Sequence, residues 1–108
     1  MNHRAEFEAE LVLAEAARIT GNEGRARVCA RRAAGMVVRS YLEEHGRVIR
    51  SRSAYDYLRR FSEREGIPQD VQGVIEHFLL KVDTAYQLPN EIDLIADARW
   101  LAIPLAEY

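Results

Sequence analysis

The segment from Asn22 to Gly46 constrains the fold of this chain more than any other part of the sequence. Its residue pattern predicts one long helix with a seam of small side chains on one side and arginines on the other. The seam comprises Ala26, Cys29 or Ala30, Ala33, Val37 and Tyr41. Small side chains let a neighbouring helix approach closely, because the distance between helix axes follows side-chain size. The segment therefore predicts helix-on-helix packing.

Helix boundary signals recur along the rest of the chain, whereas strand signals are nearly absent. There is no sustained alternation of period two and no Asn-Gly or Asp-Gly hairpin turn. A first helix is expected from Arg4 to Ile19, ended by Gly21 and followed by Asn22 as the N-cap of the long helix. Its expected inward stripe comprises Phe7, Leu11 and Ala14, with Val12, Leu13, Ala16 and Ile19 beside them.

Three further helices are predicted after Gly46, which ends the long helix. Residues 47–52 form a basic connector, and Ser53 with Asp56 resembles a capping box at the start of the third helix. Gly66 is expected to end that helix. Pro68 is placed near the start of the fourth, whose core face is predicted at Val71, Val74, Ile75, Phe78, Leu79, Val82 and Ala85.

A break at Leu88-Pro89-Asn90 precedes the last predicted helix. Asn90 with Asp93 is expected to cap this helix, which should end before Pro104. Its core positions are Leu94, Ile95, Ala98 and Leu101. The sequence thus predicts an all-α, antiparallel up-down bundle of four to five helices, with residues 1–108 forming a single helical-bundle domain.

Composition narrows the cellular setting and the chemistry. The chain of 108 residues has 48% hydrophobic and 30% charged residues, which is typical of a globular protein. Its single cysteine, Cys29, excludes an internal disulfide, and the sequence shows neither a signal-peptide pattern nor a membrane-length apolar run, so a cytoplasmic protein without a membrane segment is expected. Three histidines and one cysteine give no zinc spacing, and no phosphate-binding glycine loop is present, so no metal or cofactor is expected.

Charge is unevenly distributed. Residues 1–60 contain twelve arginines and eight acids, whereas residues 61–108 contain three basic residues and nine acids, giving +4, −6 and a net charge of −2. Arginine presents a planar fork that suits phosphate. A nucleotide- or RNA-binding surface is predicted at Arg25, Arg31, Arg32, Arg47, Arg50 and Arg52. The alternative is that these arginines form a solvated face paired with acids.

Several segments together resemble the HEPN helical-bundle family of prokaryotic proteins. The similar residues are Leu13-Ala14-Glu15-Ala16, the turn Gly21-Asn22-Glu23-Gly24, the run from Ala26 to Met36, and Ser53-Ala54-Tyr55-Asp56-Tyr57-Leu58 after a basic loop. The resemblance implies a small bundle, a homodimer, and a role as partner of a minimal nucleotidyltransferase in a toxin–antitoxin pair. Other family members are metal-independent ribonucleases with an Arg, four to six residues, and a His.

Arg39 and His45 match that ribonuclease spacing, with five residues between them. In this reading His45 would move a proton at the 2′-hydroxyl or leaving oxygen, and Arg39 would stabilise charge on the phosphate. Two residues six apart on a helix, however, differ by roughly 120° in direction and about 9 Å in rise. The alternative is a solvated Arg39 and a His45 that interacts with the helix C-terminus.

Three functions remain open from the sequence. The leading hypothesis is a non-catalytic HEPN-type module that binds a minimal nucleotidyltransferase and also nucleotide or RNA. The second is a ribonuclease toxin that uses Arg39 and His45. The third is a structural or regulatory bundle that makes only protein–protein contacts. Aromatic residues could stack on bases or form core edges and interface anchors: Tyr41, Tyr55, Tyr57, Tyr86 and Trp100.

Overall fold

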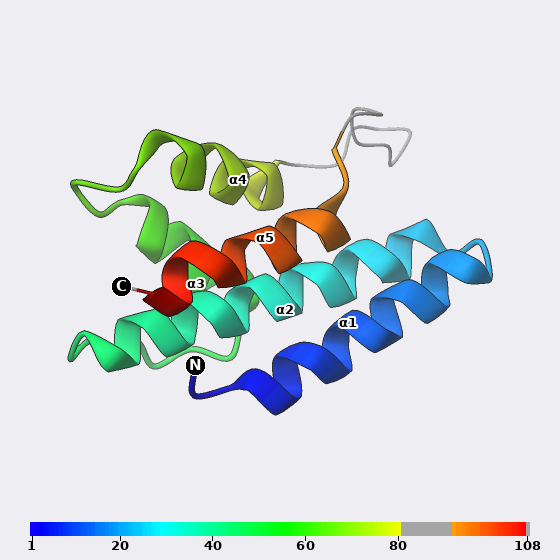
Figure 1. Cartoon of the computed structure of the whole chain (residues 1–108), viewed down its shortest axis with the longest axis horizontal. Helices are drawn as coiled ribbons and strands as arrows, with labels where there is room; N and C mark the ends of the chain where they lie inside the picture. Colours follow the sequence, from blue (N-terminus) through cyan, green and yellow to red (C-terminus); the bar gives the residue numbers. More distant parts are fainter. Residues whose placement is uncertain (81–91, 108) are drawn as a thin grey trace.

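The computed structural model of the chain describes residues 1–80 and 92–107. Within these residues the protein is all-α, as predicted, and forms five helices (Figure 1). Their bounds are α1 Arg4–Ile19, α2 Glu23–Glu44, α3 Ala54–Ser62, α4 Gln69–Leu79 and α5 Leu94–Glu107. None of the helices in this part of the chain is both long enough and apolar enough to cross a membrane.

The capping residues expected from the sequence set several helix ends. Asn22 accepts a hydrogen bond from the backbone N–H of Arg25 at 3.1 Å and starts α2. Ser53 accepts one from the N–H of Asp56 at 3.3 Å and starts α3. Gly21 has a φ of 82°, a left-handed conformation that glycine adopts without steric cost. These local signals explain why the first two helix spans agree with the prediction.

Helix α2 is the central element of the fold. It contacts α1, α3 and α5, while α4 packs against α3 and α5. Figure 1 shows α1 running beside α2 along one edge of the molecule, with α5 running along the other side of α2 and with α3 and α4 on the side away from α1. The predicted small-residue seam is confirmed, because Ala26, Ala30 and Ala33 are completely buried. These side chains allow the close approach of helices that α2 needs with neighbours on several sides.

The predicted stripe of α1 is only partly correct. Phe7, Leu11 and Ala14 are buried, as expected. The apolar residues placed beside them, in contrast, are exposed: Val12, Leu13, Ala16 and Ile19. The reason is that α1 packs mainly against a single neighbour, α2, so only one of its faces is covered.

The later helix ends also differ from the prediction. Helix α5 continues through Pro104 rather than ending before it, and burial of Leu101 and Leu105 on either side offsets the backbone donor that proline lacks. Helix α3 ends at Ser62, and Gly66 lies in the following turn with a φ of 79°. Helix α4 ends at Leu79, followed by an extended Leu80. The predicted core positions Val82 and Ala85, and the break at residues 88–90, lie outside the described residues.

Candidate anion-binding pocket

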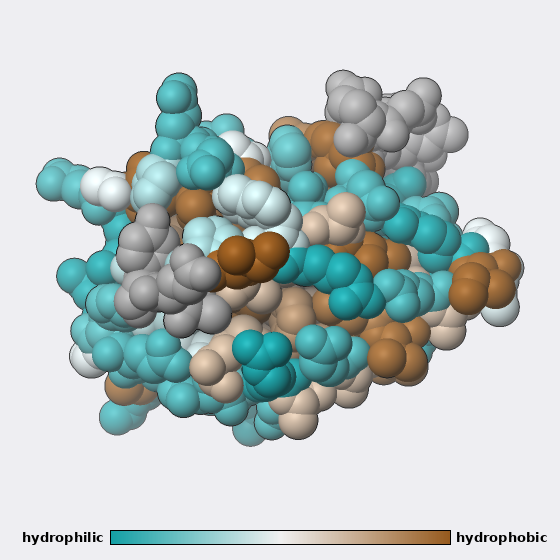
Figure 2. Space-filling view, in the orientation of Figure 1, coloured by the Kyte–Doolittle hydropathy of each residue, from teal (hydrophilic) through white to brown (hydrophobic). Residues whose placement is uncertain are grey.

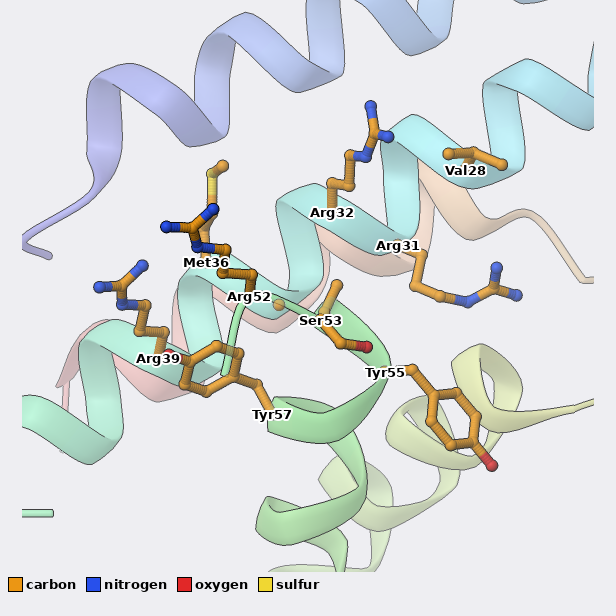
Figure 3. Close-up of a pocket in the computed structure, with 11 residues that line it drawn as sticks. Val28, Arg31, Arg32, Met36, Arg39, Arg52, Ser53, Tyr55 and Tyr57 are labelled. Atoms are coloured by element: carbon orange, nitrogen blue, oxygen red, sulfur yellow. The ribbon is translucent and has the colours of Figure 1, made fainter. Parts of the chain in front are cut away.

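A cavity of about 430 Å³ lies between α2 and the start of α3 (Figure 3). Four of its lining residues are arginines and two are tyrosines, and no aspartate or glutamate of the described residues lines it. The complete lining is Val28, Arg31, Arg32, Gly35, Met36, Arg39, Arg52, Ser53, Ala54, Tyr55 and Tyr57. A concave site with several positive charges and no acid is suited to an anionic ligand.

One face of α2 forms the floor of this pocket. Val28, Arg32, Gly35 and Arg39 follow one another at spacings of four, three and four residues, so their side chains share a helix face. Gly35 lies directly against the first residue of α3, Ala54. A Cβ atom on Gly35 would lie 2.7 Å from the Cβ of Ala54 and 2.9 Å from its Cα. The missing side chain therefore lets the start of α3 lie directly against α2.

Tyr57 fixes the connector that precedes α3. Its side chain is buried, and its hydroxyl lies 2.9 Å from the carbonyl oxygen of Ile49 and 2.8 Å from that of Ser51. The hydroxyl donates its single proton to these two acceptors. Ser51 in turn donates to the carboxylate of Asp56 at 2.7 Å. These contacts hold the residues on both sides of Arg52 and so set where its side chain enters the pocket.

Arg31 is the most enclosed cation of the pocket. It is half-buried, and its Nε donates to the carbonyl oxygen of Phe78 at 3.0 Å, in the last turn of α4. Burial lowers the pKa of its guanidinium, because the charged form loses hydration. The hydrogen bond uses Nε and leaves the two terminal nitrogens for another acceptor. Burial has removed part of the hydration of this charge, and an anion bound here would compensate for that loss.

Arg39 is the one pocket arginine with a carboxylate partner in the described chain. Its Nε donates to Glu43 at 3.0 Å, and its guanidinium lies over the ring of Tyr57, 5.6 Å from the centroid. The same carboxylate oxygen lies 2.8 Å from Nε2 of His3. The hydrogen bond with His3, and then the charge of Arg39, lower the pKa of Glu43 despite its partial burial. Arg39 is thus partly neutralised.

The remaining pocket cations differ from Arg39 in their surroundings. Among the described residues, no carboxylate forms an ion pair with Arg31, Arg32 or Arg52. Figure 3 shows Arg39 and Arg52 towards one end of the cavity, near Tyr57, and Arg31 towards the other end, near Tyr55. The arginine side chains are therefore spread along the pocket rather than clustered at one point. Such a distribution suits a ligand with more than one negative group.

The other predicted binding arginines lie elsewhere. Arg47 lines a separate hollow of about 820 Å³ together with two other arginines, Glu63 and Glu65. Arg50 lines another of about 480 Å³ that includes Asp56. Arg25 is exposed on α2 and does not line the pocket. The structure therefore brings together Arg31, Arg32 and Arg52 from the predicted set and leaves a binding role for the other three as a prediction.

His45 and Arg39 occupy different surroundings. His45 is the C-cap of α2, its Nδ1 donates to the carbonyl oxygen of Tyr41 at 2.8 Å, and its ring stacks on the Tyr41 ring with 4.1 Å between centroids. This agrees with the alternative in which His45 interacts with the helix C-terminus. Because only Arg39 lines the pocket, a ribonuclease site formed by the pair stays a prediction.

Metal and thiol sites each require a particular arrangement of side chains. Among the described side chains, no group of three His, Cys, Asp or Glu residues is arranged to hold a metal ion. Cys29 is buried, and burial raises the pKa of its thiol, which disfavours the reactive thiolate. His77 lies 2.9 Å from Asp97 and links α4 to α5.

Comparison with known proteins adds no family to this description. No protein-family model matches the sequence, and neither the curated proteins nor the solved structures gave a match. The pocket must therefore be interpreted from its own residues.

Sequence reasoning missed part of this site. The sequence does not predict Met36, Val28 and Ser53 as lining a binding surface, and it predicts Arg39 as a catalytic residue or a solvated cation rather than as part of the binding set. The periodic row of Arg32, Gly35 and Arg39 could have indicated a shared helix face. Which element covers that face was not evident, because it depends on how closely α3 approaches α2.

Proposed function

We propose that this protein is a non-catalytic binding module that holds a phosphate-bearing ligand, a nucleotide or RNA, in the pocket between α2 and α3. The observation that supports this proposal is the set of three arginines that line one cavity without a carboxylate partner in the described chain. Side chains with unpaired charge at a concave surface attract and orient anions, and arginine matches phosphate geometry with two parallel hydrogen bonds.

The tyrosines favour a nucleotide or RNA over a simple anion. Tyr55 is 40% exposed and lies at the Arg31 end of the pocket, so part of its side chain is accessible to a ligand. Base stacking on an aromatic ring adds affinity without requiring a particular base. The exposed Val28 beside the same end adds apolar surface for a base. Phosphates would contact the arginines while a base contacts Tyr55.

The HEPN resemblance extends this proposal to partners. An all-α bundle with an arginine-rich second helix is compatible with that family. By this resemblance, the protein would form a homodimer and bind a minimal nucleotidyltransferase, in a toxin–antitoxin pair of the bacterial or archaeal cytoplasm. The proposed pocket would then hold part of the nucleotide or RNA on which such a partner acts.

Binding of fluorescein-labelled single-stranded RNA and of a fluorescent ADP analogue, followed by anisotropy in EDTA, tests the proposal. The informative variant is Arg31→Gln with Arg52→Gln, and its matched control is Arg47→Gln with Arg50→Gln. We expect the pocket variant to bind at least about tenfold more weakly and the control to stay within about twofold of wild type. The RNA affinity should fall with salt with a slope of about −2, since three phosphate contacts are available and each contributes about 0.7.

Three outcomes would contradict the proposal. If neither ligand bound, the phosphate site would be refuted. If both double variants lost affinity equally, binding would reflect diffuse electrostatic attraction to the basic surface rather than a site in the pocket. Cleavage of the RNA in EDTA by wild type, abolished in His45→Ala, would replace it with the ribonuclease function. Circular dichroism of every variant establishes that the helices are retained.

A further inference from the structure

The outer face of α1 is an apolar surface without a partner in the described structure. Ala5, Ala9, Val12, Ala16 and Ile19 follow one another at alternating spacings of four and three residues, and all are exposed. This spacing places them on one side of the helix. Val12 is 63% exposed and Ile19 85%, while the opposite side of α1 is buried.

A helix that is apolar on two opposite sides usually has neighbours on both of them. Helix α1, however, packs against α2 and makes only a small contact with α5. Leu13, which is 43% exposed, extends the apolar face on one side. Figure 2 shows hydrophobic surface along the half of α1 that leads to the turn before α2, with hydrophilic surface around it. A contiguous exposed apolar area bordered by polar residues is typical of a protein–protein interface.

The residues that border this face are mainly acidic. Glu6 lies on the same side as Leu13, and Glu8 and Glu15 lie on the other side, with Arg4 as the one cation near the N-terminal end. Glu15 pairs with Arg99 of α5. Within the described residues, neither Glu6 nor Glu8 forms an ion pair, so the border keeps uncompensated negative charge.

This charge pattern disfavours a second copy of α1 as the occupant. In an antiparallel pair centred on Val12, Glu8 would face Glu15 of the other copy, since their residue numbers are almost symmetric about position 12. In a parallel pair, the side with Glu8 would face the side with Glu6. Both arrangements place acids together, and like charges across an interface oppose association.

We propose that the outer face of α1 binds an amphipathic helix of another protein, one with an apolar stripe bordered by lysine or arginine. The apolar stripe of that helix would cover Val12 and Ile19, and its basic borders would neutralise Glu6 and Glu8. Each protein would thereby complete a helix pair whose two sides are compatible in shape and charge. This surface is separate from the arginine pocket, which α2 and α3 form.

Two synthetic helical peptides with the same leucine stripe, one with lysine borders and one with glutamate borders, test the proposal by fluorescence anisotropy. We expect wild type to bind the lysine peptide at least about tenfold more tightly than the glutamate peptide, by charge complementarity. Val12→Asp with Ile19→Asp should abolish this binding, whereas Val48→Asp, at a distant residue that is 80% exposed, should not change it. Glu6→Lys with Glu8→Lys should reverse the peptide preference while leaving the apolar face intact.

The proposal is overturned if wild type does not distinguish the two peptides, or if Glu6→Lys with Glu8→Lys leaves the preference unchanged. Sedimentation of wild type alone supplies a further test. A dimer that Val12→Asp with Ile19→Asp converts to monomer would identify a second copy as the occupant and would also overturn it. Unchanged circular dichroism and thermal unfolding of the α1 variants show that they are folded, so this test does not depend on whether the arginine pocket binds RNA.

Discussion

Two regions of this protein carry arginine in similar density and differ in what surrounds it. In the pocket between α2 and α3, four arginines meet no lining acid, and only Arg39 has a carboxylate partner among the described residues. In the hollow around Arg47, three arginines are interspersed with Glu63 and Glu65. The first region therefore combines cations with no acid among its described lining residues, whereas in the second region acids lie among the cations and reduce the local positive charge. Composition alone therefore does not identify a binding surface, because the position of the acids decides the local potential.

Gly35→Ala should have the largest effect, because it disturbs the contact that builds the first region. The added methyl group would meet Ala54 at 2.7 Å and force α3 away from α2. We expect a loss of about 1–3 kcal/mol in the free energy of unfolding, the usual range for overpacking, measured by urea denaturation. RNA binding should weaken in parallel.

The double variant Gly35→Ala with Ala54→Gly is the control for that contact. It removes the methyl group that the new side chain meets, so it should recover part of the lost stability. If Gly35→Ala alone were as stable as wild type, the close approach of α3 to α2 would not constrain the pocket.

Met36→Glu should place a carboxylate among the pocket arginines, as Glu63 and Glu65 lie among those of the Arg47 hollow. Residue 36 lines the pocket, four residues after Arg32 and three before Arg39, so a carboxylate there can pair with both. RNA affinity should fall about tenfold, which corresponds to about 1.4 kcal/mol. The neutral variant Met36→Gln should bind within about twofold of wild type, and equal loss in both variants would point to shape rather than charge.

Glu63→Gln with Glu65→Gln should make the second region resemble the first. Removal of both acids leaves the arginines of the Arg47 hollow uncompensated. In a protein whose pocket is already disabled by Arg31→Gln and Arg52→Gln, we expect RNA affinity at low salt to rise about two- to threefold. An unchanged affinity would show that the acids do not limit this region, and that its shape does.

Glu43→Gln should have the smallest effect, and that effect should depend on pH. The pKa of Glu43 is lowered in the folded protein, so its ionised form stabilises the fold above the ordinary glutamate pKa of about 4.3 and loses this contribution as pH falls through the lower, folded value. At pH 6 the free energy of unfolding of wild type should exceed that of the variant by no more than about 0.5 kcal/mol, because the Glu43 side chain is partly exposed. Thermal unfolding at pH 6 and pH 3 should show a smaller difference at the lower pH.

The fold was predictable wherever a local signal determines structure. Asn22 and Ser53 place their helix starts through one hydrogen bond each, and Gly21 supplies the left-handed residue between α1 and α2. Two predictions failed for reasons that lie beyond local sequence. The burial of Val12 depends on whether any helix covers the second side of α1, and the effect of Pro104 depends on packing around it.

The sequence predicted the type of site, a surface that binds anions, but not which arginines form it. Arginine-rich α2 indicated an anion-binding surface, yet the sequence does not show that Arg52 joins Arg31 and Arg32 while Arg47 and Arg50 lie elsewhere. That division depends on the path of residues 47–53, which the buried Tyr57 fixes through its hydroxyl. A side chain that is distant in sequence thus determines which basic residues share a cavity.

The central position of α2 has a consequence for how the molecule opens. Its buried residues face α1, α3 and α5, so its backbone hydrogen bonds cannot be exposed to water without separating three helix interfaces at once. Its amide protons should therefore exchange only through unfolding of the whole protein, while those of α4, which has fewer neighbours, can exchange by local opening. We therefore expect the helix that forms the floor of the pocket to be the last to lose its structure.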